Sequence, residues 1–110
     1  MIFRILRICK SVFHNNVSLT EDGLNHTLLR HPELKRMPNI ENEIVKTVNA
    51  PERVVRGLHG GHIAIRYVGI TVYGAKYMIV PYDEGGEVRT AFITSDVDRI
   101  IRRGVLWRSP

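Results

Sequence analysis

The pattern of hydrophobic and polar positions divides this chain into a helical first half and a strand-forming second half. Before residue 50, apolar residues recur at the three- and four-residue spacing of one helix face. From Arg53 onward, apolar and polar residues alternate in short runs that glycine-containing segments separate, as strands do. We therefore predict an α+β fold in which N-terminal helices pack on one face of a roughly four-stranded antiparallel sheet, with a short C-terminal helix.

Two helices are predicted in the first half. Residues 18–21 read Ser-Leu-Thr-Glu, which has the form of a capping box, and predict a helix over residues 19–29. Asn39 is the expected cap of a second helix, which ends at the Ala-Pro pair at 50–51. The residues expected to face the core are Leu24 and Leu28 on the first helix and Ile40, Ile44, Val45 and Val48 on the second.

The second half predicts a meander of short strands. The expected strands are 54–55, 62–68, 76–80 and 88–94, with turns or loops at 57–61, 69–74 and 83–86. Asp96 is expected to cap a short terminal helix that ends before Gly104. Leu106 and Trp107 would then pack as a C-terminal anchor.

The first residues combine apolar side chains with cations. Arg4, Arg7 and Lys10 recur every three residues, so residues 1–15 are expected to form a basic amphipathic N-terminal helix, and residues 16–110 a single α+β domain. No uncharged stretch approaches the roughly 20 residues of a membrane span. Docking of that helix against the core is favoured over association with a membrane surface, because docking is the more common fate of such a helix.

Charge and cysteine usage narrow the function classes. Sixteen Lys and Arg against eleven Asp and Glu give a net charge of +5, which favours polyanionic partners such as RNA or DNA. A single cysteine, Cys9, excludes an intrachain disulfide framework and a Cys-rich zinc site. We therefore expect a reducing, cytoplasmic location.

His31 is the strongest candidate for chemistry. It lies between Arg30 and Pro32, where proline restricts its backbone to an extended conformation. A histidine can exchange a proton near neutral pH, which a general acid or base requires. The alternative is a histidine that only caps the junction between two helices.

The order of several short segments resembles a known group. They are residues 30–34 (Arg-His-Pro-Glu-Leu), 49–54, 76–80, 90–96 and 104–107. Together they resemble the phage-associated branch of the barnase, EndoU, colicin and RelE-like nucleases, over roughly residues 26–107. The resemblance implies a nuclease-like α+β domain that cuts RNA without a metal or another cofactor and is often deployed as a toxin. It also implies an acidic immunity or antitoxin protein as a partner.

Metal-free RNA cleavage uses the ribose 2′-hydroxyl as an internal nucleophile. The protein must supply a base, an acid and groups that stabilise the charged phosphorane. We predict His31 as acid or base, Arg66 as the cation for the phosphate and Thr90 as a hydroxyl contact. Further candidates are Thr94 and His26 for catalysis, and Arg30, Arg53, Lys76 and His62 for substrate binding.

Other readings of the chain remain open. The same basic surface could belong to a non-catalytic module that binds RNA or a protein, and the amphipathic N-terminus to a peripheral membrane or phage-assembly component. A metal site at His59 and His62 is disfavoured because the pair lacks Cys partners in a Gly-rich loop. That loop, residues 57–61, matches neither a P-loop nor a dinucleotide-binding fingerprint.

Overall fold

The computed structural model describes residues 4–71 and 74–110, and they form an α+β fold. Neighbouring strands of the main sheet are antiparallel, in the spatial order β6-β5-β4-β3-β7. A separate hairpin of β1 and β2 precedes the helices. The strands are β1 Ile5–Lys10, β2 Asn16–Thr20, β3 Arg53–Arg56, β4 His62–Thr71, β5 Gly74–Tyr82, β6 Phe92–Thr94 and β7 Val105–Arg108. The helices are α1 Glu21–Arg30, the 3-10 helix η1 Pro32–Arg36, α2 Ile40–Asn49 and α3 Asp98–Ile101.

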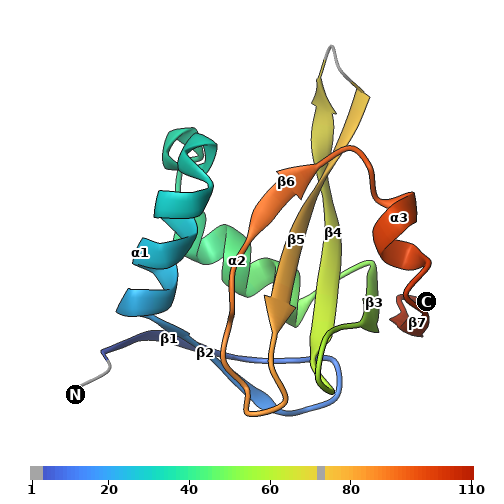
Figure 1. Cartoon of the computed structure of the whole chain (residues 1–110), viewed down its shortest axis with the longest axis horizontal. Coiled ribbons are helices and arrows are strands. Elements are labelled where there is room, and N and C mark those ends of the chain that lie inside the picture. Colours follow the sequence, from blue (N-terminus) through green and yellow to red (C-terminus); the bar gives the residue numbers. More distant parts are fainter. Residues whose placement is uncertain (1–3, 72–73) are drawn as a thin grey trace.

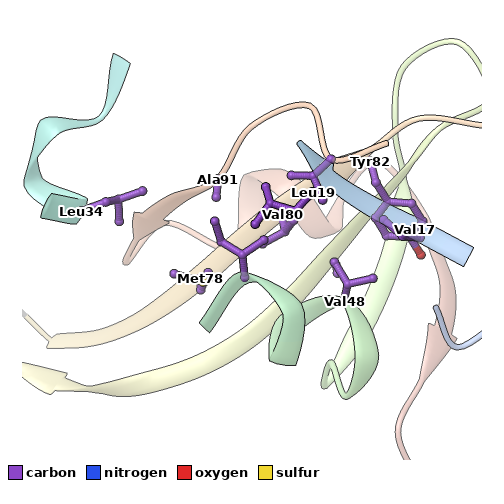
Figure 2. Packing of buried hydrophobic residues seen from close by; sticks show 11 residues of the cluster. Val17, Leu19, Leu34, Val48, Met78, Val80, Tyr82 and Ala91 are labelled. Carbon is purple, nitrogen blue, oxygen red and sulfur yellow. The ribbon is translucent and has the colours of Figure 1, made fainter. Parts of the chain in front are cut away.

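The main sheet has a different helix partner on each side (Figure 1). Alternation along β5 sends Met78, Val80 and Tyr82 into the larger core cluster, where they meet Ile44 and Val48 of α2. Figure 2 shows Leu19 of β2 beside Val80 in the same cluster, so the N-terminal hairpin also closes this core. The residues between these, such as Ile79, belong to the smaller cluster on the other side, which packs against Val97, Ile100 and Ile101 around α3.

The N-terminal helix prediction is wrong for the described residues. Residues 5–10 form β1, which pairs antiparallel with β2 along the register Lys10↔Asn16 to Ile5↔Thr20. A short helix is marginal in water without strong packing, whereas the hairpin satisfies the backbone groups of both segments. Residues 1–3 of the predicted helix lie outside the described residues. Within the described part of the chain, no helix is long and apolar enough to cross a membrane.

Both helices predicted in the first half are present as α1 and α2, but the residue that caps the N-terminus of α1 differs from the prediction. Helix α1 begins at Glu21 because Leu19 is buried in β2, and the Thr20 hydroxyl accepts the Gly23 N–H at 3.0 Å. Helix α2 begins directly after Asn39 as predicted, although Asn39 has φ 56° and its side chain makes no capping bond. Leu24 and Leu28 pack against the larger cluster as expected.

The sheet has five strands rather than the predicted four. The expected C-terminal anchor is strand β7, which pairs with β3 at Trp107↔Val54. Of the predicted strand 88–94, only the residues Phe92–Thr94 form a strand, β6. Asp96 does not cap α3, because the helix begins after Val97 and the Asp96 N–H donates to the Thr94 hydroxyl at 3.0 Å.

The shortening of β6 has a clear cause. Residues 87–89 still pair with the end of β5, since Asp83 N–H donates to Glu87 O at 3.0 Å and Arg89 N–H to Pro81 O at 2.9 Å. The register then slips by one residue between the Val88↔Tyr82 bridge and the Phe92↔Ile79 pair, so residues 89–91 do not form a regular strand. The turn predicted at 83–86 is confirmed by the Gly86 N–H donating to Asp83 O at 3.0 Å.

Replacing Thr20 with alanine tests the cap of α1. Thr20→Ala removes the acceptor for the Gly23 N–H and should lower the free energy of unfolding by about 1 kcal/mol, measured by urea denaturation. Thr20→Ser keeps the hydroxyl and should recover most of the loss. Equal losses in both variants would contradict the capping role.

Candidate functional site

A pocket of 360 Å³ lies between the end of α1 and the segment that leads into β6. We call it the histidine pocket, and its lining residues are His26, Arg30, His31, Arg89, Thr90 and Phe92. Four of the nine residues predicted for the site are among them: His31, His26, Thr90 and Arg30.

His31 is held at the junction of two helices. Its N–H ends α1 by donating to Thr27 O at 2.8 Å, and Pro32 starts η1 immediately afterwards. Its ring lies 5.5 Å from the Phe92 ring, centroid to centroid, and its Nδ1 is 3.7 Å from the Glu33 carboxylate. The side chain stays partly exposed, so the imidazole is oriented but accessible from solvent.

Helix α1 presents two further polar side chains beside His31. His26 and Arg30 are four residues apart, which places them on the same face of the helix, and both are exposed. A second imidazole and a guanidinium therefore reach the same pocket from the last turns of one helix.

The opposite wall comes from the irregular segment that leads into β6. The Thr90 Oγ1 atom is buried and has no hydrogen-bond partner among the described residues. Arg89 is exposed, and its guanidinium lies 3.5 Å from the Asp83 carboxylate. A buried hydroxyl without a partner is costly, so a ligand atom that pairs with it would be favoured.

A second hollow of 510 Å³, which we call the apolar pocket, shares two lining residues with the histidine pocket. Arg89 and Thr90 line both pockets. Among the described lining residues of the two pockets, three arginines stand against one carboxylate, that of Asp83. The two pockets together, hereafter the cationic groove, therefore suit an anionic ligand. The apolar pocket is also lined by Leu58, His59, Ile63, Pro81 and Arg103.

Arg66 does not belong to the cationic groove. Its Nε donates to the Thr47 hydroxyl at 3.0 Å, and its terminal nitrogen pairs with the Glu43 carboxylate, both on α2. Only 15% of the side chain is exposed. The predicted grouping of His31, Arg66 and Thr90 is therefore not formed, because Arg66 extends from the sheet face that α2 covers.

The remaining predicted residues are dispersed. Thr94 accepts the Asp96 N–H, Arg53 is opposite Ile65 in the β3–β4 ladder, and Lys76 is opposite Gly69 near the end of the β4–β5 hairpin. None of these three is among the residues that line the groove. His62 does line the apolar pocket, while its ring contacts Phe13 and Tyr82 with centroids 5.0 and 5.4 Å away.

Arg89 and Phe92 were missed from the sequence. Strand phase over 88–94 would place Arg89 and Thr90 on opposite faces of the sheet, which hides Arg89 as a partner of Thr90. The segment is irregular up to Ala91, so adjacent side chains reach the same pocket. The one-residue slip in the pairing with β5, between Val88 and Phe92, is not predicted by any local pattern of residues.

The described residues contain no group of three or more His, Cys, Asp or Glu side chains arranged to hold a metal ion. His59 and His62 both line the apolar pocket. The polar side chains that line the histidine pocket are imidazoles, guanidiniums and a hydroxyl.

Removing Arg66 should affect stability. Arg66→Ala leaves the Glu43 carboxylate without its guanidinium partner on a partly buried surface, and we expect a loss of about 2 kcal/mol in the free energy of unfolding. Urea denaturation of Arg66→Ala, Glu43→Ala and the double variant measures the coupling between them. Losses that simply add would contradict a direct interaction.

His62 should make stability depend on pH. Burial lowers the pKa of His62, and the nearby Glu84 carboxylate opposes this shift only in part. The unfolded chain therefore binds the proton more readily than the folded one, so the stability contributed by neutral His62 is present above about pH 6.5 and declines as the pH falls below it. Denaturation from pH 7.5 to 5.5 should show this decline, and His62→Gln should reduce the slope. An unchanged slope would assign the dependence to other groups.

Comparison of the chain with family models, with curated proteins and with solved structures found no match. The functional assignment therefore depends on the residues of the cationic groove.

Proposed function

We propose that this protein is an endoribonuclease that cleaves RNA by attack of the ribose 2′-hydroxyl on the adjacent phosphate, without a metal ion. The observation that carries the proposal is the composition of the histidine pocket. Two imidazoles, two guanidiniums and an unpartnered hydroxyl converge on a space of 360 Å³. These are the groups that transesterification of a phosphodiester needs.

The two histidines supply the proton transfers. One imidazole removes the proton from the 2′-hydroxyl as its oxygen attacks phosphorus, and the other protonates the 5′-oxygen as the P–O5′ bond breaks. The products are a 2′,3′-cyclic phosphate and a free 5′-hydroxyl. His31 and His26 can fill these roles in either order, and the contacts of His31 with Phe92 and Glu33 fix its orientation.

Arg89 takes the role that sequence reasoning gave to Arg66. Its pairing with Asp83 at 3.5 Å is between exposed groups and is therefore weak, so a phosphate can compete for the guanidinium. Arg30 approaches from α1, and the Thr90 hydroxyl can donate to a phosphoryl oxygen. Charge that builds up on the phosphorane would thus meet cations from both walls of the pocket.

The fold is compatible with the resemblance to the barnase, EndoU, colicin and RelE-like nucleases. An antiparallel sheet with helices preceding it is the architecture that the resemblance implies. This supports the assignment to that superfamily as a proposal, and with it a basic groove that an acidic inhibitor protein would fit.

Cleavage of labelled mixed-sequence RNA in EDTA tests the proposal. The protein should produce 2′,3′-cyclic phosphate ends, and His31→Ala and His26→Ala should each lower the rate by about 10²- to 10⁴-fold, since each removes a proton-transfer group. Arg89→Ala should lower it by about 10²-fold.

Arg36→Ala is the matched control, because Arg36 is an exposed cation on η1 outside the groove. Its rate should stay within about twofold of the parent, as expected for loss of a surface charge alone. Intact RNA, or equal cleavage by all the variants, would refute the assignment. Salt-dependent RNA binding without turnover would instead identify a binding module.

A further inference from the structure

We infer that the apolar pocket is a subsite for a nucleobase that flanks the scissile phosphate. The inference rests on the proposed function and extends it, because it states which part of the RNA the second hollow holds. It also gives a role to the Gly-rich loop at residues 57–61, which forms one wall of the hollow.

The apolar pocket adjoins the histidine pocket, where the phosphate is proposed to bind. Arg89 and Thr90 line both hollows, so a phosphate held between them and the histidines lies at the entrance of the apolar pocket. In a nucleic acid strand the group next to a phosphate is a nucleoside. A chain that places its phosphate in the histidine pocket therefore brings a flanking base to the apolar pocket.

The lining of the apolar pocket suits a nucleobase. Leu58, Ile63 and Pro81 provide apolar surface, and His59 adds an aromatic ring. Leu58 is 70% exposed, which leaves a large apolar side chain at the rim with little cover from the protein itself. Nucleobases have flat faces that favour such surfaces over water, and the volume of 510 Å³ falls in the range of about 300–1,000 Å³ typical of small-molecule sites.

The loop is fixed in advance of binding. Gly57 N–H donates to Gly61 O at 2.9 Å and Gly61 N–H to Leu58 O at 2.8 Å, which closes a tight turn. A Cβ on Gly57 would lie 2.9 Å from the Gly61 carbonyl carbon, so the turn excludes larger residues there. His59 is held at φ 50°, in the left-handed region that few residues other than glycine adopt.

Polar groups at the rim can orient the base. The Asp83 carboxylate accepts the Glu87 N–H at 3.0 Å, and Arg103 Nε donates to Arg56 O at 3.0 Å. Both side chains are thereby held in place at the pocket and offer an acceptor and a donor for the edge of a base. A few fixed polar groups around an apolar surface are typical of specific small-ligand sites.

Binding of uncleavable oligonucleotides tests the subsite separately from catalysis. A 2′-deoxy tetranucleotide lacks the attacking hydroxyl, and a set of such tetranucleotides would each carry one abasic position. NMR titration should show about tenfold weaker binding for one internal abasic position and changes below about twofold for the others, because stacking contributes at one base only. Leu58→Ala should weaken binding of the intact oligonucleotide about fivefold and reduce the abasic effect, whereas Leu29→Ala, an equally exposed leucine on α1, should change neither.

The possible results separate the two proposals. If RNA is cleaved but every abasic position has the same effect, or if Leu58→Ala matches Leu29→Ala, the subsite is refuted and the nuclease assignment stands. If one abasic position and Leu58 matter but RNA stays intact, the subsite is supported in a binding module. If no oligonucleotide binds, the subsite is refuted.

Discussion

The register slip between β5 and the segment that leads into β6 is the constraint on which the groove depends. Val88 is opposite Tyr82 and Phe92 is opposite Ile79, so four residue steps on one segment face three steps on β5. Without that slip, Arg89 and Thr90 would alternate along a regular strand. With it, they face the end of α1, where His26, Arg30 and His31 are presented.

Each face of the main sheet carries its own hydrophobic core. The face under α2 and the N-terminal hairpin holds the larger core cluster, and Arg66 is bound there to Glu43 and Thr47. The other side carries a smaller cluster with the residues around α3. The groove residues lie at the margins of these cores, where side chains can be oriented by packing and still meet solvent.

The hydrophobic pattern along the sequence was sufficient to predict the second helix and three strands of the main sheet. The predicted second helix matches α2, and the predicted strands at 54–55, 62–68 and 76–80 lie inside β3, β4 and β5. Strand β7 was missed because it forms by pairing with β3, which is distant in the sequence. Strand β1 was missed although its partner β2 is the next segment of the chain, because the three-residue spacing of Arg4, Arg7 and Lys10 was interpreted as a helix face. The prediction of the site residues has the same limit. Alternation along β4 correctly places Ala64 and Arg66 on one face of the sheet, but the sequence does not show that α2 covers this face.

Gly86 lets the turn before β6 approach the N-terminal hairpin closely, and that has a thermodynamic consequence. Its φ of 84° and the 2.4 Å that would separate a Cβ from Asn16 O mean that only glycine fits at this contact. Two backbone hydrogen bonds to Ser18 hold this turn, which directly precedes Arg89 and Thr90, against the hairpin. Ligand occupancy and hairpin docking are thus linked equilibria, so a ligand held by Arg89 and Thr90 stabilises the N-terminal strands, which it never touches, against local opening.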